Sequence, residues 1–258
     1  MKLFFLILLF ITSSLSVSAQ IRDTISISAK NLETKLIKKG RHSYIVYFKD
    51  SVQAPSKNIQ IVKINITDKI YNNNKAIAIE QSWERDTIIH SANTILKHSD
   101  LSTLYHEYFW KGNKSNIIYD FVNKNIIFNS KTADSIKVKT KENFIKSFKN
   151  YNLNWHSDLV ILPLLPFKEN RVFKINFYDP PSESMEVYYS VIGSDFLTSS
   201  LGKKIECWVL EFVVPKKYGG GYQHFWISKK NRELLKEEDL FGKIYRYKLK
   251  LNVSEKNM

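Results

Sequence analysis

Cysteine is almost missing from this chain of 258 residues, which contains only Cys207. A single cysteine excludes an internal disulfide, so the stability of the fold has to come from a hydrophobic core. Cys207 lies between Ile205 and Val209 in an apolar run. We therefore predict that its thiol is a small buried group rather than a reactive one, and no second cysteine exists to complete a metal site.

A hydrophobic run long enough to cross a membrane is also missing. The uncharged apolar run Leu3–Ile11 is shorter than the roughly twenty residues that span a bilayer as a helix. It follows a positively charged start and precedes a short polar segment that ends in Val17-Ser18-Ala19. This pattern predicts a secretory signal peptide, residues 1–19. We expect the mature chain, residues 20–258, to be exported to the periplasm or outside the cell, soluble or attached to the outer membrane, without a transmembrane span.

Acidic residues are few compared with basic ones. The chain has 25 Asp and Glu against 39 Lys and Arg, which gives a formal net charge of +14. A basic surface fits an anionic envelope component such as a lipid headgroup or a glycan, and export argues against nucleic acid. The lysines are spread along the whole chain, as a composition rich in Lys, Asn and Ile also produces. Both interpretations of the charge stay open.

Signals for catalysis are absent as well. His106-Glu107 begins a metalloprotease-like pattern, but Trp110 stands where the second zinc ligand is needed. The six histidines include no pair two, three or four residues apart, and neither a phosphate-binding loop nor a nucleophile elbow occurs. We predict a non-enzymatic protein with no metal and no cofactor. The acidic cluster Glu237-Glu238-Asp239 is interpreted as a solvated turn, with a cation site as the alternative.

Alternating apolar residues, by contrast, are abundant, and they predict antiparallel strands joined by turns rich in Gly, Asn and Lys. The most regular stretch, Val187–Gly242, predicts a meander, and Asn72-Asn73-Asn74 predicts the turn of an earlier hairpin. Ile136 and Val138 suggest a further short strand. The main predicted strands are Ser43–Phe48, Ile59–Ile66, Ala76–Trp83, Thr87–Leu96, Thr103–Trp110, Ser115–Val122, Ile126–Phe128, Val172–Tyr178, Met185–Ile192, Ile205–Val214, Tyr222–Ile227 and Ile244–Val253.

Helical spacing appears only near the middle of the chain. Apolar residues at helical intervals predict a helix over Lys141–Tyr151. A second, shorter helix is predicted over Asp158–Leu165, where Pro163 and Pro166 end it. No Pro-rich or Ser-rich linker separates the parts of the chain. We therefore expect residues 20–258 to form a single domain.

Several strands carry apolar residues on both faces. In Ile205–Val214, one face holds Trp208, Leu210, Phe212 and Val214, and the other holds Ile205, Cys207, Val209 and Val213. An antiparallel strand with one solvated face alternates cleanly, so apolar residues on both faces predict a sheet that curves around something. The predicted mid-chain helices are the first candidate for this filling, and a bound apolar ligand is the second.

Tryptophan is the residue type most suited to lining such a ligand site. The aromatic rings could contact an acyl chain or a sugar, or they could be ordinary core residues of a large curved sheet. The candidate ligand-binding residues are Trp83, Trp110, Trp155, Trp208 and Trp226.

A set of short motifs resembles an exported bacterial family, the domain-of-unknown-function 3108 family. The motifs are Tyr119-Asp120-Phe121, Leu162-Pro163 before Phe173–Phe177, Val191-Ile192-Gly193, Gly202–Trp208, and Phe225–Ser228 before Leu234–Lys236. None of them is catalytic. The resemblance implies a fold similar to the lipoprotein-carrier half-barrel of LolA and LolB, whose concave face is covered by helices.

These observations predict a mainly β, α+β fold, in which an antiparallel meander curves into a half-barrel and one or two mid-chain helices cover the concave face. The leading functional hypothesis is a periplasmic or outer-membrane-associated protein that holds a lipid or a lipoprotein acyl chain in that face. The alternative is an envelope scaffold or protein-interaction module with a filled core and a basic binding surface.

Overall fold

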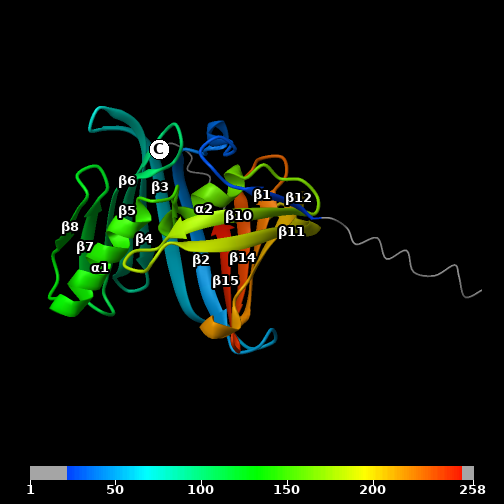
Figure 1. Ribbon diagram of the computed structural model, residues 1–258. Coiled ribbons are helices and arrows are strands. Elements are labelled where there is room, and N and C mark those ends of the chain that lie inside the picture. Colours follow the sequence, from blue (N-terminus) through cyan, green and yellow to red (C-terminus); the bar gives the residue numbers. More distant parts are fainter. Residues whose placement is uncertain (1–21, 252–258) are drawn as a thin grey trace, which may run out of the picture.

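The computed structural model describes residues 22–251, which form one sheet of 15 strands (Figure 1). The predicted signal peptide lies outside the described residues. The predicted mainly β fold is confirmed. The strands are β1 (Asp23–Ser26), β2 (Gly40–Lys49), β3 (Lys57–Tyr71), β4 (Asn74–Glu84), β5 (Ile88–Lys97), β6 (Thr103–Trp110), β7 (Ser115–Asp120), β8 (Asn125–Phe128), β9 (Leu153–Asn154), β10 (Arg171–Tyr178), β11 (Met185–Thr198), β12 (Lys204–Val213), β13 (Gly221–Ser228), β14 (Leu234–Phe241) and β15 (Ile244–Leu251).

Helical structure is limited to short segments. They are α1 (Asp134–Ser147), α2 (Asp158–Ile161) and the 3-10 turns η1 (Thr34–Leu36), η2 (Trp155–Ser157), η3 (Leu162–Leu164) and η4 (Lys216–Tyr218). Among residues 22–251, no helix is both long enough and apolar enough to span a membrane.

The strand order consists of two blocks that each follow the chain. Strands β2 to β8 form one block and β10 to β15 the other. The blocks join where β15 pairs antiparallel with β2, with Tyr247 opposite Tyr47. Within residues 22–251, parallel pairing occurs only along β10, whose partners β1 and β9 run in the same direction. The first and last parts of the chain therefore belong to one continuous sheet.

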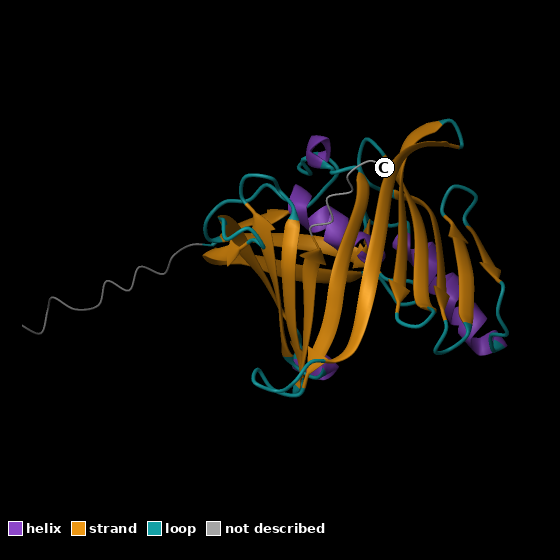
Figure 2. Ribbon diagram, turned by 180° about the vertical axis from the view of Figure 1, so that it is seen from behind, coloured by secondary structure: helices purple, strands orange, loops and turns teal. Residues whose placement is uncertain are grey.

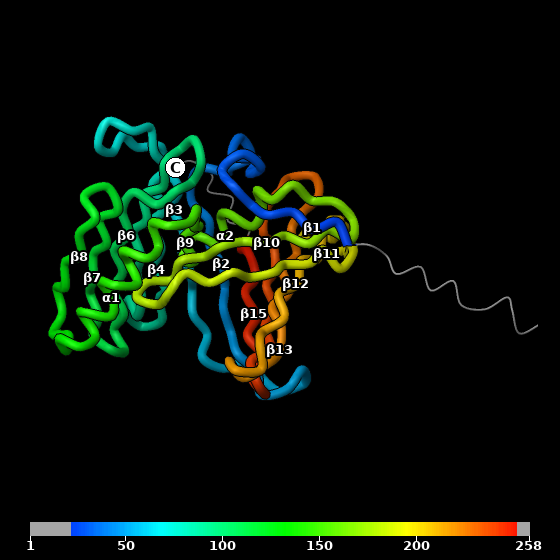
Figure 3. The backbone as a smooth tube through the Cα atoms, in the orientation of Figure 1, coloured from blue at the N-terminus to red at the C-terminus, as the bar shows by residue number. Residues whose placement is uncertain are grey.

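The sheet curves strongly around α2. In Figure 1, β10 and β11 run across the direction of β2 and β15, and α2 lies inside the bend. Figure 2 shows from behind that the helices lie on one side of the strands, and the backbone trace in Figure 3 follows the same bend. The structure is thus an open, half-barrel-like sheet, as predicted.

The concave side is filled mainly by the α2–η3 segment. The main core contains the buried residues Leu159, Val160, Ile161, Leu162, Leu164 and Leu165 from this segment, packed against inward side chains of the sheet. Helix α1 covers the other end of the sheet, where Phe144 packs against Tyr119, Phe121 and Tyr178. The prediction that mid-chain helices fill the curved sheet is confirmed for both segments.

The two faces of β12 are also as predicted. Leu210 and Phe212 belong to the main core inside the curve, whereas Cys207 and Val209 pack with Trp226 on the outer side. Cys207 is fully buried, and burial raises the pKa of its thiol to about 11. The prediction of a buried, unreactive thiol agrees with this environment.

The helix predictions need two corrections. Helix α1 begins at Asp134, so Ile136 and Val138 are helical rather than part of a strand, and both are more than half exposed. Two alternating residues are too few to distinguish a strand from an exposed helix turn. At the other end, α1 stops at Ser147. Tyr151 therefore lies beyond the helix, and its hydroxyl donates a hydrogen bond to the carbonyl oxygen of Asp100.

The interpretation of Glu237-Glu238-Asp239 as a solvated turn is wrong. These residues lie within β14, and Glu237 and Asp239 are 1% and 0% exposed. The alternation of buried and exposed residues is present in β14, but charged side chains occupy the buried positions. A search for alternating apolar residues could not detect such a strand.

We predict that the fold depends on the filling of the curve by η3. Leu162→Ala, at a fully buried position, is expected to lower the free energy of unfolding by about 2 to 5 kcal/mol, because it removes core contacts and leaves a cavity. Leu201→Ala, at a position that is 83% exposed, is the matched control and is expected to change it by less than about 0.5 kcal/mol. Denaturant unfolding measures both, and equal effects would contradict this account.

Candidate functional site

A cavity of about 570 Å³ lies where the inner face of the sheet meets the segment from Trp155 to Leu159. Side chains of β4, β5 and β6 form one wall, and side chains of β13 and β15 form another. Asp179, just after β10, closes the end next to η2. The volume lies within the range typical of sites for small molecules, about 300 to 1,000 Å³.

Three of the five candidate tryptophans meet at this cavity. Trp83 comes from β4, Trp110 from the end of β6 and Trp155 from η2. The Trp155 ring is fixed by Phe177, with 5.0 Å between the ring centroids. Trp110 is 48% exposed, so part of its ring is free to contact a ligand. The cavity thus has an aromatic wall built from separate parts of the chain.

The other two tryptophans lie elsewhere. Trp208 stacks on Phe167 with 6.0 Å between the ring centroids. Trp226 lies in the outer cluster with Cys207, and its Nε1 donates a hydrogen bond of 2.8 Å to Asp195. Neither ring lines the cavity, so the structure separates these two candidates from the other three.

Three histidines form a row beside the aromatic wall. The ring centroids of His90 and His156 are 5.5 Å apart, and those of His156 and His106 are 4.7 Å apart. His90 Nδ1 donates to the carbonyl oxygen of Phe109 at 2.9 Å, and His106 Nδ1 is hydrogen-bonded to Thr94 at the same distance. Burial lowers the pKa of all three, that of His156 to about 3. The row is therefore uncharged at neutral pH.

Asp179 is an acid without a cationic partner. Its Oδ1 lies 3.8 Å from Nδ1 of His156, which is neutral. Within residues 22–251, no lysine or arginine nitrogen comes within 4.0 Å of this carboxyl group. About half of its side-chain surface is accessible, and the residue lines the cavity. Desolvation in this surrounding raises its pKa to about 6.

The opposite wall contains a buried ion cluster on β14 and β15. Arg246 Nη2 lies 2.9 Å from Glu237, Arg246 Nε lies 2.6 Å from Asp239, and Lys248 contacts Glu237. Burial opposes ionisation of Glu237, but the charges of Lys248 and Arg246 keep its pKa low. Burial and the charge of Glu237 raise the pKa of Asp239 to about 8. Arg246 and Lys248 reach the cavity, but they are already paired with acids.

Asp158, at the start of α2, also lines the cavity. Its Oδ1 accepts a hydrogen bond of 2.6 Å from the backbone N–H of Leu159. Burial raises its pKa to about 6, and the charge of Lys248 acts in the opposite direction. This carboxyl group therefore couples the helix start to the ion cluster on the sheet.

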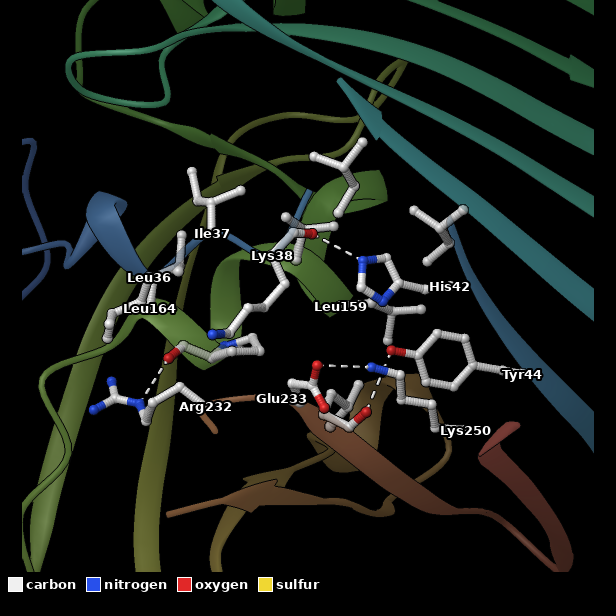
Figure 4. Close-up of a pocket in the computed structure, with 15 residues that line it drawn as sticks. Leu36, Ile37, Lys38, His42, Tyr44, Leu159, Leu164, Arg232, Glu233 and Lys250 are labelled. Carbon is white, nitrogen blue, oxygen red and sulfur yellow. Dashed lines mark hydrogen bonds and ion pairs between the residues drawn. The ribbon is translucent and has the colours of Figure 1, made fainter. Parts of the chain in front are cut away.

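A second cavity, shown in Figure 4, is too small for an organic ligand. It measures about 30 Å³, enough for very few water molecules. Its polar groups are satisfied within the protein, since His42 bonds the carbonyl oxygen of Lys38 at 2.8 Å and Lys250 pairs with Glu233 at 3.3 Å. Arg232 Nε donates to the carbonyl oxygen of Pro163 at 3.0 Å. These contacts hold η3 against the neighbouring strands.

A larger groove, of about 1,040 Å³, runs along β2 to β4. Most of its lining is charged or polar, including Arg41, Lys63 and Glu80. Such a surface suits water rather than an apolar ligand. Of these three cavities, the one of about 570 Å³ therefore has the composition of a ligand pocket. Among residues 22–251, no three His, Cys, Asp or Glu side chains are arranged to hold a metal ion.

Sequence reasoning did not identify the polar residues of the site. His90, His156 and Asp179 are far apart in the sequence and come together only through strand pairing. Strands β9 and β10 pair in parallel, with Tyr178 opposite Asn154. The residues that follow the two strands are Asp179 on one side and Trp155 and His156 on the other, so these residues are neighbours. No local motif in the sequence predicts this contact.

Comparisons with known proteins were made for the whole chain. A family model described as "Protein of unknown function (DUF3108)" matches residues 43–250. A search of curated proteins returned no match. Among solved structures, a β-barrel-like protein of domain of unknown function DUF1849 from Brucella abortus is similar over 83% of this chain and 97% of its own, with 8% identity and a TM-score of 0.38. A DUF1329 family protein from Desulfovibrio piger is similar over 87% and 89%, with 10% identity and a TM-score of 0.28.

The buried ion cluster yields a test of stability. Lys248→Met removes one of the two cations that contact Glu237, and we expect it to cost about 3 kcal/mol of unfolding free energy, because a buried carboxylate loses its partner. The control is Lys63→Met, which breaks an exposed pair with Glu84 and is expected to cost at most about 1 kcal/mol. Similar costs in denaturant unfolding would show that the cluster is not held as described.

Asp179 yields a prediction for pH dependence. Its folded-state pKa is raised from 3.8 to about 6, so its ionisation opposes folding as the pH rises through this interval and the penalty is complete above it. Asp179→Asn is therefore expected to be more stable than the unaltered protein at pH 7 to 8. The difference should vanish below the unfolded-state pKa. Thermal unfolding across pH 3 to 8 measures it, and a variant that is less stable at pH 7 would contradict the assignment.

Proposed function

We propose that this chain, which belongs to the DUF3108 family of unknown function, binds an amphipathic ligand in its 570 Å³ cavity without catalysing a reaction. Membership of this family confirms the resemblance predicted from the sequence motifs. The observation that carries the proposal is the cavity itself, which opens between the curved sheet and η2–α2 where the main core ends. Its size and mixed lining support a ligand site rather than a packing defect.

The lining supports an amphipathic ligand because it combines apolar and polar side chains. Trp83, Trp155 and Leu159 offer apolar surface, and Gln81, Gln223 and Asp179 offer polar groups. A wholly apolar ligand would leave the polar groups without partners, at a cost in binding free energy. A wholly polar ligand would leave the tryptophan rings uncovered.

The setting of the proposal is the bacterial envelope. The signal peptide predicted from the sequence supports a location outside the cytoplasm, in the periplasm or at the outer membrane. A lipid or a lipoprotein acyl chain is the amphiphile that this location supplies, in keeping with the resemblance to the lipoprotein-carrier half-barrel. We therefore propose a carrier or holding role for such a molecule.

The half-exposed ring of Trp110 gives the test. Trp110→Ala is expected to weaken binding of a fluorescent fatty-acid analogue about tenfold, since loss of an aromatic contact of about 1.4 kcal/mol corresponds to that factor. Phe196→Ala, at a position that is 59% exposed and away from the cavity, is the control and should leave binding unchanged. Fluorescence titration of the three proteins measures the affinities.

Two results would end the proposal. One is protein purified from its native host that carries no lipid by mass spectrometry and binds neither the fatty-acid analogue nor an uncharged alkyl amphiphile. The other is binding that Trp110→Ala and Phe196→Ala weaken equally.

The net charge of +14 favours a second candidate, an envelope scaffold that meets acidic partners with a basic surface. It predicts recovery of a defined partner in a pull-down, lost at high salt because exposed charges are screened. Salt-insensitive binding of an amphiphile with no such partner would count against it.

A further inference from the structure

Some charged side chains around the cavity are paired with an opposite charge, and one is not. Arg246 and Lys248 reach it, but each is paired with a buried acid of β14. Asp158 is coupled to the same cluster. Asp179 is different, because its only neighbouring titratable partner at salt-bridge distance within residues 22–251 is the neutral His156. One carboxyl group therefore lines the cavity with no cation to offset its charge.

Desolvation opposes ionisation of the Asp179 carboxyl group, although about half of its side-chain surface is accessible. The Nδ1 atom of His156, 3.8 Å away, is buried and also has no hydrogen-bond partner. Two adjacent polar groups at one end of the cavity thus lack partners in the protein. A ligand with a donor group could satisfy both, and a positive charge on that group would offset the carboxylate.

The aromatic wall favours the same sign of charge. Trp155 directly follows β9. The parallel pairing of β9 with β10 places Trp155 next to Asp179. Faces of tryptophan rings attract cations. Trp83, farther along the wall, already has Nζ of Lys248 at 5.4 Å from its ring centroid. A further cation is therefore favoured at the end of the cavity that contains Trp155 and Asp179.

We infer that the ligand carries a protonated amine, which binds between Asp179 and the Trp155 ring. This inference rests on the proposed function and names the chemical class of the headgroup. The apolar part of the ligand lies along Trp83 and Trp110. Arg85 and Lys111 line the exposed mouth, where an acidic group of the ligand would be in water and would contribute less.

The test uses three decyl amphiphiles below their micelle-forming concentrations, at one salt concentration and pH 7.5. They are decylamine, which is a protonated ammonium compound at this pH, decyl maltoside and decyl sulfate, and each competes with a fluorescent dye in the cavity. The unaltered protein is expected to bind the ammonium compound at least tenfold more tightly than the sulfate. Asp179→Asn should weaken the ammonium compound about tenfold and leave the maltoside unchanged.

Two further variants keep the result interpretable. Asp179→Glu retains the charge and should retain the preference for the ammonium compound. Asp134→Asn changes an acid that is 94% exposed on α1 and should have no effect.

Equal or tighter binding of the sulfate, lost in Lys111→Gln, would overturn the inference and place an anionic headgroup at the mouth. Equal weakening of the maltoside and the ammonium compound by Asp179→Asn would also overturn it, because Asp179 would then only support the cavity wall. Binding of the maltoside without any preference for charge refutes this inference while the proposed function stands. Failure of all three compounds to bind refutes both.

Discussion

The filling of the concave side is the constraint on which the rest of this structure depends. A sheet that bends this far creates an inner surface that must be covered, and α2, η3 and the following Leu165 supply seven consecutive buried residues, 159–165, for that purpose. The segment is short, so it does not fill the whole curve. The cavity lies where the filling ends, between η2 and the strands of both blocks.

The buried ion cluster on β14 and β15 also lies on the inner face of the curved sheet. Strands β14 and β15 turn charged side chains toward the interior, where Glu237 and Asp239 pair with Arg246 and Lys248 and one oxygen of Asp239 is left without a hydrogen-bond partner. A buried cluster of this kind is weak evidence for stability, since apolar residues of equal volume can do as well. The cluster also borders the cavity, where Arg246 and Lys248 line the site while both contact Glu237.

Much of the fold could be predicted because most strands alternate apolar residues on at least one face. The turn at Asn72 and Asn73, where both residues have positive φ, shows how local chemistry fixes a hairpin. Strand β14 could not be predicted, since Glu237 and Asp239 occupy its inward positions. The site was predictable only in its aromatic part. Asp179 and His156 meet through the β9–β10 pairing, which no spacing in the sequence indicates.

The most direct test of the account is a crystal structure of the protein purified from its native host. The account predicts continuous ligand density in the cavity, with an apolar part along Trp83 and Trp110 and a polar end between Trp155 and Asp179. A cavity that is closed by the side chains of Trp110 and Leu159, or that contains only ordered water, would contradict it.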